Sequence, residues 1–137
     1  MDRPSYVFVC QHGSAKSVIA SEHFRRLAVE HGLDVDVASA GTEPDAEIPP
    51  RVVEGLLGDG IDVRALAPRP ATRAALQHAS RIIAFGCDLR QVAPAGVPVE
   101  RWDGVPAVSD GYARARDAIL GRVRTLVHEL RAPVRGG

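Results

Sequence analysis

Near residue 10 an apolar run leads into a polar loop, in the stretch Val7-Phe8-Val9-Cys10-Gln11-His12-Gly13-Ser14-Ala15-Lys16-Ser17. The run Ser5–Val9 is short and rich in β-branched and aromatic residues, which is typical of a strand buried on both faces of a sheet. From Ser17 to about His31 the apolar residues recur at helical spacing. A strand that passes through a short loop into a helix indicates an α/β domain.

The alternation of strands and helices continues along the chain. Further strands are expected at 35–38, 81–85 and 97–102, and helices at 50–57, at 72–78 and from a cap at Ser109 to about residue 132. We therefore expect one α/β domain over residues 1–132, with a four-stranded parallel sheet and helices on both faces, and a short flexible tail at 133–137. Ligands of such sheets bind at the carboxyl ends of the strands. Cys10 and Cys87 both lie there.

The composition excludes several classes of protein. With 137 residues, 45% hydrophobic and 25% charged residues and a formal net charge of zero, the chain reads as a soluble globular protein. Its charge gives no reason to expect a nucleic-acid partner or a membrane surface. No apolar run reaches the roughly 20 residues of a membrane span, and no secretion signal is evident, so a cytoplasmic location is expected.

Two cysteines are too few for a disulfide framework or a structural zinc site, and we expect no metal and no cofactor. In a reducing compartment each cysteine is either a small buried apolar residue or a reactive thiol. The histidines His23, His31, His78 and His128 lack metal-ligand spacing and are expected at the surface or at helix ends. Asp62 is expected to fix a turn.

The loop after the first strand has the features of an anion site. A loop that enters a helix N-terminus directs several backbone N–H groups, here those of residues 11–17, toward one point, where the helix dipole also favours negative charge. The same surroundings stabilise a cysteine thiolate, which suits attack on a bound tetrahedral oxyanion. Lys16, the only lysine in the chain, and the hydroxyls of Ser14 and Ser17 add donors. His12 either donates to the anion or faces solvent.

A nucleotide-binding loop is the competing interpretation. Lys16 and Ser17 occupy the K-[ST] positions of the pattern G-x-x-x-x-G-K-[ST]. However, Cys10 and Ala15 stand where that pattern has glycines, and without them the backbone loses the close approach to phosphate. The pattern therefore disfavours a nucleoside triphosphate.

Five segments in order share one further similarity. They are the C-x5-K-S loop at 10–17, Ser39-Ala40-Gly41-Thr42, Gly60-Ile61-Asp62, the stretch 82–87 that ends in Cys87, and Trp102-Asp103…Pro106-Ala107 followed by Arg116-Asp117-Ala118-Ile119. Together they resemble the low-molecular-weight protein tyrosine phosphatase family, including its thioredoxin-type arsenate reductase branch. The resemblance runs almost from end to end and implies the family's Rossmann-like three-layer fold.

The resemblance also implies roles for individual residues. Cys10 would be the nucleophile that forms a covalent phospho- or arseno-cysteine, and the amides of Gln11, His12, Gly13, Ser14, Ala15 and Lys16 would bind the oxyanion. Ser17 would hydrogen-bond the cysteine sulfur. In a reductase, Cys87 would be the resolving thiol. The implied partners are phosphate, arsenate or a phosphorylated substrate, and thioredoxin or a small thiol as reductant.

The chain departs from the family pattern at four places. Lys16 replaces an arginine, whose planar fork binds two oxygens where lysine offers a point charge. Gly13 replaces a loop asparagine, and Val105 falls where the family has its general-acid aspartate. Asp103 and Asp110 flank that position and either substitute for the acid or are plain surface carboxylates. Residues 89–94 contain no third cysteine for a reductase relay.

Three functions follow from these observations. A cysteine-dependent phosphatase acting on a small oxyanion or a phosphotyrosine is the first, and an arsenate reductase that uses Cys10 and Cys87 is the second. A non-catalytic binder of anions or phosphopeptides is the third, favoured by Lys16 and Val105 and disfavoured by the retained nucleophile Cys10.

Overall fold

A computed structural model describes residues 3–131 of the chain. The tail expected at 133–137 lies outside the described residues. In chain order the elements are β1 (Ser5–Cys10), α1 (Lys16–Glu30), β2 (Asp36–Gly41), α2 (Pro50–Gly58), α3 (Arg73–Leu76), β3 (Arg81–Ala84), β4 (Val99–Arg101), a 3₁₀ turn η1 (Val108–Asp110) and α4 (Tyr112–Arg131).

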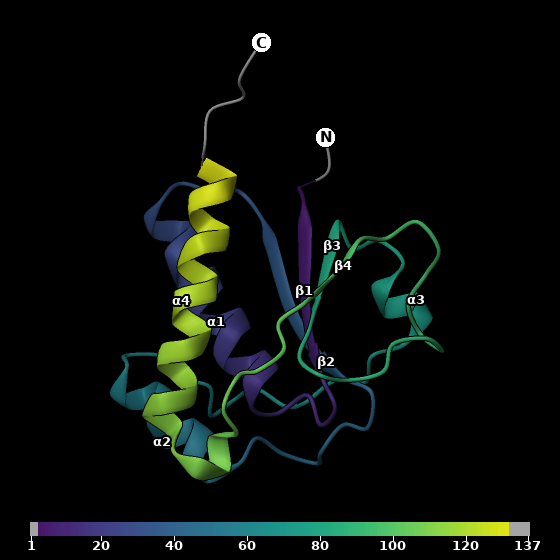
Figure 1. Cartoon of the computed structure of the whole chain (residues 1–137). Helices are drawn as coiled ribbons and strands as arrows, with labels where there is room; N and C mark the ends of the chain where they lie inside the picture. Colours follow the sequence, from purple (N-terminus) through teal and green to yellow (C-terminus); the bar gives the residue numbers. More distant parts are fainter. Residues whose placement is uncertain (1–2, 132–137) are drawn as a thin grey trace.

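The four strands form one parallel sheet, as the sequence predicts, and their order in it is β2-β1-β3-β4 (Figure 1). β1 lies in the middle and pairs with β2 as far as Cys10 and Gly41, and with β3 as far as Val9 and Ala84. Since all strands run the same way, their carboxyl ends meet at one edge of the sheet. Cys10 is the last residue of β1 and lies at that edge.

Helices cover both faces of the sheet. Successive side chains of a strand point to opposite faces, so each face has apolar side chains that a helix can bury. Figure 1 shows α1, α2 and α4 on one side of the sheet and the short α3 on the other. From β1, Tyr6, Phe8 and Cys10 pack in the cluster with α1 and α4, whereas Val7 and Val9 pack in the second cluster. The nucleophile proposed from sequence therefore lies on the α1 face.

Three predicted boundaries were wrong. Ser109 does not cap the final helix, because it lies within η1; Gly111 then adopts a φ of 147°, and α4 begins at Tyr112. The strand expected at 97–102 is only Val99–Arg101. The second strand extends through Gly41, since its pairing with β1 continues to Cys10.

Among residues 3–131, no helix has the length and apolar character needed to cross a bilayer. The same residues contain no group of three or more histidine, cysteine, aspartate or glutamate side chains arranged to hold a metal ion.

Candidate active site

Cys10 lies where β1 ends and the polar loop begins. Its side chain is only 7% exposed, and its Sγ lies 3.1 Å from the hydroxyl oxygen of Ser17, which is fully buried in the first turns of α1. A buried hydroxyl at this distance donates to a thiolate and stabilises the charge. The pairing of Cys10 with Ser17 is the contact that the family resemblance implies.

The loop from residue 11 to residue 17 is held from outside by the segment that follows β2. The carbonyls of Cys10, Gln11 and His12 accept hydrogen bonds from the backbone N–H groups of residues 42, 43 and 45, at 3.3, 2.7 and 3.0 Å. These carbonyl groups are thus occupied by the segment that follows β2, and the backbone N–H groups of the loop remain to be considered. Within the described residues, the N–H groups of 11–18 donate to no protein acceptor, so the loop can bind an oxyanion.

Gly13 allows the loop to lie directly on β2. Its φ is 61°, and a Cβ at Gly13 would come within 2.6 Å of the backbone nitrogen of Gly41. A Cβ at Gly41 would likewise lie 2.4 Å from the nitrogen of Gly13. Both glycines are therefore required by the close approach of two backbones, and any side chain at position 13 would displace the loop.

A pocket of about 570 Å³ opens beside Cys10. Cys10, Gln11, His12, Ser14, Ala15 and Lys16 line it, whereas Gly13, which was also expected in the anion site, is not in the lining. Its other walls are formed by Asp45, Pro49, Arg51, Val52, Phe85, Gly86, Ala107, Val108 and Ser109. Of these, Asp45, Pro49, Arg51 and Val52 had no functional role predicted from the sequence. Segments that follow β2 and β3 reach the same sheet edge as the Cys10 loop. The position of these segments after β2 and β3 is the feature of the sequence from which Asp45 and Arg51 could have been proposed as pocket residues.

Two cations border the pocket. The Nζ of Lys16 donates to the carbonyl oxygen of Val105 at 3.1 Å, which joins the loop to the segment before η1. The guanidinium of Arg51 donates to the carbonyl of Ser109 at 2.8 Å. Arg51 lies in the first turn of α2, and it brings a guanidinium to a pocket whose loop carries lysine.

The segment expected to supply the general acid brings no carboxylate into the pocket lining. The side chain of Val105 is 8% exposed and packs in the α1-face cluster. Asp103 is outside the lining and lies 3.5 Å from the Nε of Arg101, and Asp110, in η1, is also outside it. Among the described residues, Asp45 is the carboxylate that lines the pocket.

Cys87 lies at the same sheet edge but in the second cluster, on the opposite face from Cys10. Its side chain is 6% exposed, and its Sγ donates to the carbonyl of Val9 at 3.6 Å. Burial raises the pKa of the Cys87 thiol, and a negative charge on nearby Cys10 raises it further. Cys87 therefore adjoins Cys10 through the backbone of β1, and the raised pKa favours its thiol form.

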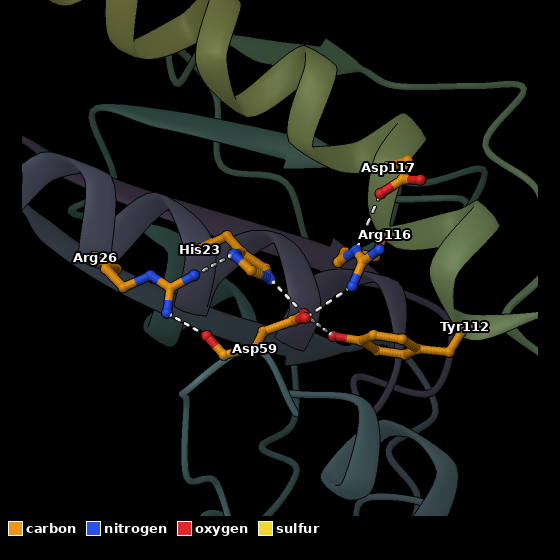
Figure 2. Close-up of polar contacts among 6 residues, drawn as sticks. All are labelled: His23, Arg26, Asp59, Tyr112, Arg116 and Asp117. Carbon is orange, nitrogen blue, oxygen red and sulfur yellow. Dashed lines mark hydrogen bonds and ion pairs between the residues drawn. The ribbon is translucent and has the colours of Figure 1, made fainter. Parts of the chain in front are cut away.

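His23 was expected at the surface or at a helix end, and this was wrong, because it lies within α1 and its side chain is 2% exposed. Figure 2 shows it within a polar network centred on Asp59, which follows α2. Asp59 accepts hydrogen bonds from the Tyr112 hydroxyl and from Arg116, both at 2.7 Å, and lies 3.2 Å from the Nε2 of His23. We call these four residues, His23, Asp59, Tyr112 and Arg116, the Asp59 network.

The Asp59 network joins α1, α2 and α4 and lies outside the pocket lining. Burial lowers the pKa of His23, against the opposing effect of Asp59. For Asp59, burial acts to raise the pKa, but the hydrogen bonds from Tyr112 and Arg116 outweigh it and the pKa is lowered. Neutral histidine and ionised aspartate are thus the forms that the fold favours. Asp62, as expected, fixes a turn by accepting from the N–H of Arg64 at 3.0 Å.

The fold is similar to those of known proteins. The chain is 29% identical to an arsenate reductase of Archaeoglobus fulgidus, with a TM-score of 0.69 over 90% of this chain and 98% of that one. It is 27% identical to a thioredoxin-dependent arsenate reductase of Corynebacterium glutamicum, with a TM-score of 0.77 over 94% of this chain, which spans 62% of that protein. A low molecular weight phosphotyrosine phosphatase of Vibrio cholerae is 20% identical, with a TM-score of 0.83 over 93% and 97% of the two chains.

No curated protein matches the chain by sequence. The family profile described as low molecular weight phosphotyrosine protein phosphatase matches residues 5–101, which include the Cys10 loop, the central strands and Cys87. These residues are more than half of the chain. The chain therefore belongs to the low molecular weight phosphotyrosine protein phosphatase family, whose members are enzymes.

Proposed function

We propose that the protein is a cysteine-dependent phosphatase that removes the phosphoryl group from phosphate monoesters through a covalent intermediate on Cys10. The observation that carries this proposal is the surroundings of the thiol. Its Sγ lies 3.1 Å from the Ser17 hydroxyl and beside a loop whose N–H groups at 11–18 have no acceptor among the described residues.

The reaction would proceed in two displacements. The Cys10 thiolate attacks phosphorus, so that the S–P bond forms while the P–O bond breaks and its electron pair stays on the leaving oxygen. Water then attacks the phosphocysteine, and the S–P bond breaks to give inorganic phosphate and the thiolate. The loop amides bind the equatorial oxygens in both steps. The Ser17 hydroxyl stabilises the thiolate as it departs.

The walls of the pocket favour an aryl phosphate, such as a phosphotyrosine side chain. Val52, Phe85 and Val108 provide apolar surface beside the anion loop, which suits a flat aromatic group attached to the phosphate. Lys16 would hold the anion as a point charge rather than through a planar fork. The hydrogen bond from Lys16 to the Val105 carbonyl would fix the position of the ammonium group and restrict its movement during the reaction.

An arsenate reductase is the second candidate, supported by the position of Cys87 and by the two arsenate reductases at 27% and 29% identity. In that reaction Cys10 forms an adduct with arsenate and loses water. The Cys87 thiolate then attacks the Cys10 sulfur, so that arsenic(V) leaves as arsenite and the two thiols become a disulfide. Thioredoxin or a small thiol would reduce the disulfide. Because Cys10 and Cys87 pack on opposite faces of the sheet, the segment after β3 would have to move before the two sulfurs could form a disulfide.

Rapid-quench intact mass spectrometry with 4-nitrophenyl phosphate tests the proposal. A phosphatase should show one added phosphoryl group on the wild-type chain and on Cys87→Ala, and none on Cys10→Ser. A Cys10–Cys87 disulfide after incubation with arsenate, together with no phosphoenzyme, would support the reductase instead. Phosphate binding without either covalent species would identify a non-catalytic anion binder and overturn both enzymatic proposals.

A further inference from the structure

The first displacement needs a proton for the leaving oxygen, and Val105 cannot supply it. Among the pocket-lining residues described by the structure, His12 carries the imidazole and Asp45 the carboxyl, the two side-chain types that most often serve as general acids. The two are in contact with each other. The Nδ1 of His12 lies 3.4 Å from Oδ1 of Asp45 and 3.3 Å from the carbonyl oxygen of Glu43.

Two further hydrogen bonds hold the His12–Asp45 pair. The N–H of Asp45 donates to the carbonyl of His12 at 3.0 Å, which ties the two residues through the main chain. The hydroxyl of Ser14 donates to Oδ2 of Asp45 at 2.7 Å, which orients the carboxylate. In the described part of the chain, the Nε2 of His12 has no protein partner. The imidazole is therefore held by one nitrogen while the other is free.

This arrangement matches what a positioned imidazole needs. A carboxylate on one ring nitrogen fixes the tautomer and stabilises the imidazolium, and the opposite nitrogen exchanges the proton with the reactant. His12 lies two residues after Cys10, in the loop that would hold the phosphate, so a leaving group would depart within the same pocket. The contacts of His12 also fall on residues 43 and 45, outside the segment 103–110 that was expected to carry the acid.

Resting on the proposed phosphatase function, we infer that His12 is the catalytic acid and that Asp45 is its positioning residue. As the P–O bond breaks, the proton on Nε2 of His12 moves to the leaving oxygen, and His12 becomes neutral. In the second displacement the neutral imidazole takes a proton from the attacking water as the S–P bond breaks. The cycle thus returns imidazolium and thiolate without a further reactant.

Leaving groups of different acidity test the inference, with kcat/KM as the measurement. His12→Asn should lower kcat/KM for phenyl phosphate by ~10²-fold or more, because phenolate needs protonation. For 2,4-dinitrophenyl phosphate, whose leaving group needs no proton, the loss should stay below about 3-fold. Asp45→Asn should show the same preference at about 10-fold. His31→Asn, at the exposed end of α1, is the matched control and should change neither rate.

Chemical rescue separates an acid from a structural residue. Added imidazole should restore hydrolysis of phenyl phosphate by His12→Ala and leave its hydrolysis of the dinitrophenyl ester unchanged. Equal losses on both substrates, without rescue, would overturn the inference. A larger selective loss in Asp45→Asn than in His12→Asn, or a selective loss in Asp103→Asn or Asp110→Asn, would place the acid on that carboxyl and overturn it as well.

The two proposals fail in different ways. If the wild-type protein forms no phosphoenzyme and hydrolyses neither ester, the phosphatase function itself is wrong. If the wild-type protein hydrolyses both esters and His12→Asn keeps the same ratio between them, the phosphatase function stands and the assignment of the acid is wrong.

Discussion

Two polar regions of the molecule differ in how their hydrogen bonds are used. In the Asp59 network the carboxylate accepts hydrogen bonds from the Tyr112 hydroxyl and the Arg116 guanidinium of α4 and lies 3.2 Å from the His23 ring of α1 (Figure 2). In the Cys10 loop the carbonyls are bonded outward, while the N–H groups of 11–18 find no acceptor within residues 3–131. Paired polar groups stabilise a fold, and unpaired donors converging on one point bind a ligand. The first region should govern stability, and the second should govern activity.

Cys10→Ser should produce the largest effect, a loss of activity without a loss of stability. Loss of the proposed nucleophile should lower aryl-phosphate hydrolysis at least ~10⁴-fold, because serine at this position is a far weaker nucleophile than a thiolate. The melting temperature should change little, since the two side chains have similar size. A steady-state assay with 4-nitrophenyl phosphate and a thermal melt measure both. Hydrolysis unchanged in Cys10→Ser would exclude the thiol as nucleophile.

Asp59→Asn should have the opposite profile. The asparagine amide has one acceptor oxygen, whereas the aspartate carboxylate has two charged ones, so either Arg116 or Tyr112 loses its hydrogen bond. The free energy of unfolding should fall by about 3 kcal/mol. Because the network lies outside the pocket lining, kcat/KM at 20 °C should remain close to wild type. Urea denaturation gives the stability. A matched loss of activity in the folded variant would show that the two regions are coupled.

Gly13→Ala should weaken phosphate binding by the loop more than the strain of its positive φ alone would. Gly32 supplies a control, because its φ is 69° and a Cβ there would meet nothing within 4 Å. Gly32→Ala should cost about 1 kcal/mol of strain and leave activity intact. Gly13→Ala adds the clash with Gly41, so phosphate affinity by isothermal titration calorimetry should fall well below that of Gly32→Ala. Equal behaviour would contradict the close approach.

Lys16 tests how the loop holds its anion. Lys16→Met should lower kcat/KM by roughly 10- to 100-fold, the value of a charge-assisted hydrogen bond. If lysine acts as a weaker arginine, Lys16→Arg should raise the rate, since a planar fork binds two oxygens at once. A fall in Lys16→Arg would instead show that the loop depends on the bond from lysine to the Val105 carbonyl.

The smallest effect concerns the pH dependence of stability. The pKa of His23 is lowered in the fold, so the unfolded chain binds the proton first, and stability is lost as the pH falls below about 6.5. The lowered pKa of Asp59 continues this loss below its ordinary value of about 3.8. His23→Gln should flatten the pH profile of urea unfolding between about pH 7 and 5. A profile as steep as wild type would assign the dependence to other groups.

The sequence predicted the parts of the site that are local in the chain. The apolar run before Cys10, the helix after Ser17 and the contact between them follow from a few neighbouring residues, and the parallel sheet follows from the order of strands and helices. Boundaries that turn geometry decides were predicted wrongly, as at Ser109, which lies in a 3₁₀ turn instead of capping α4.

The parts that could not be predicted depend on tertiary contacts. Asp45 and Arg51 enter the pocket because the segment after β2 folds over the loop, and no periodicity marks that approach. His23 has charged neighbours along α1 and reads as exposed, but Asp59, 36 positions later, lies against it and satisfies its ring in the interior. Burial of a polar residue becomes visible only when its distant partner is known.

A crystal structure with orthovanadate tests the central claim most directly, because vanadate forms a bond to an attacking thiolate and takes the geometry of the phosphoryl transition state. We predict a vanadium–sulfur bond to Cys10, with the N–H groups of residues 11–17 donating to the equatorial oxygens and the Nε2 of His12 facing the apical oxygen. Vanadate bound away from Cys10, or held without donation from the loop amides, would contradict the account.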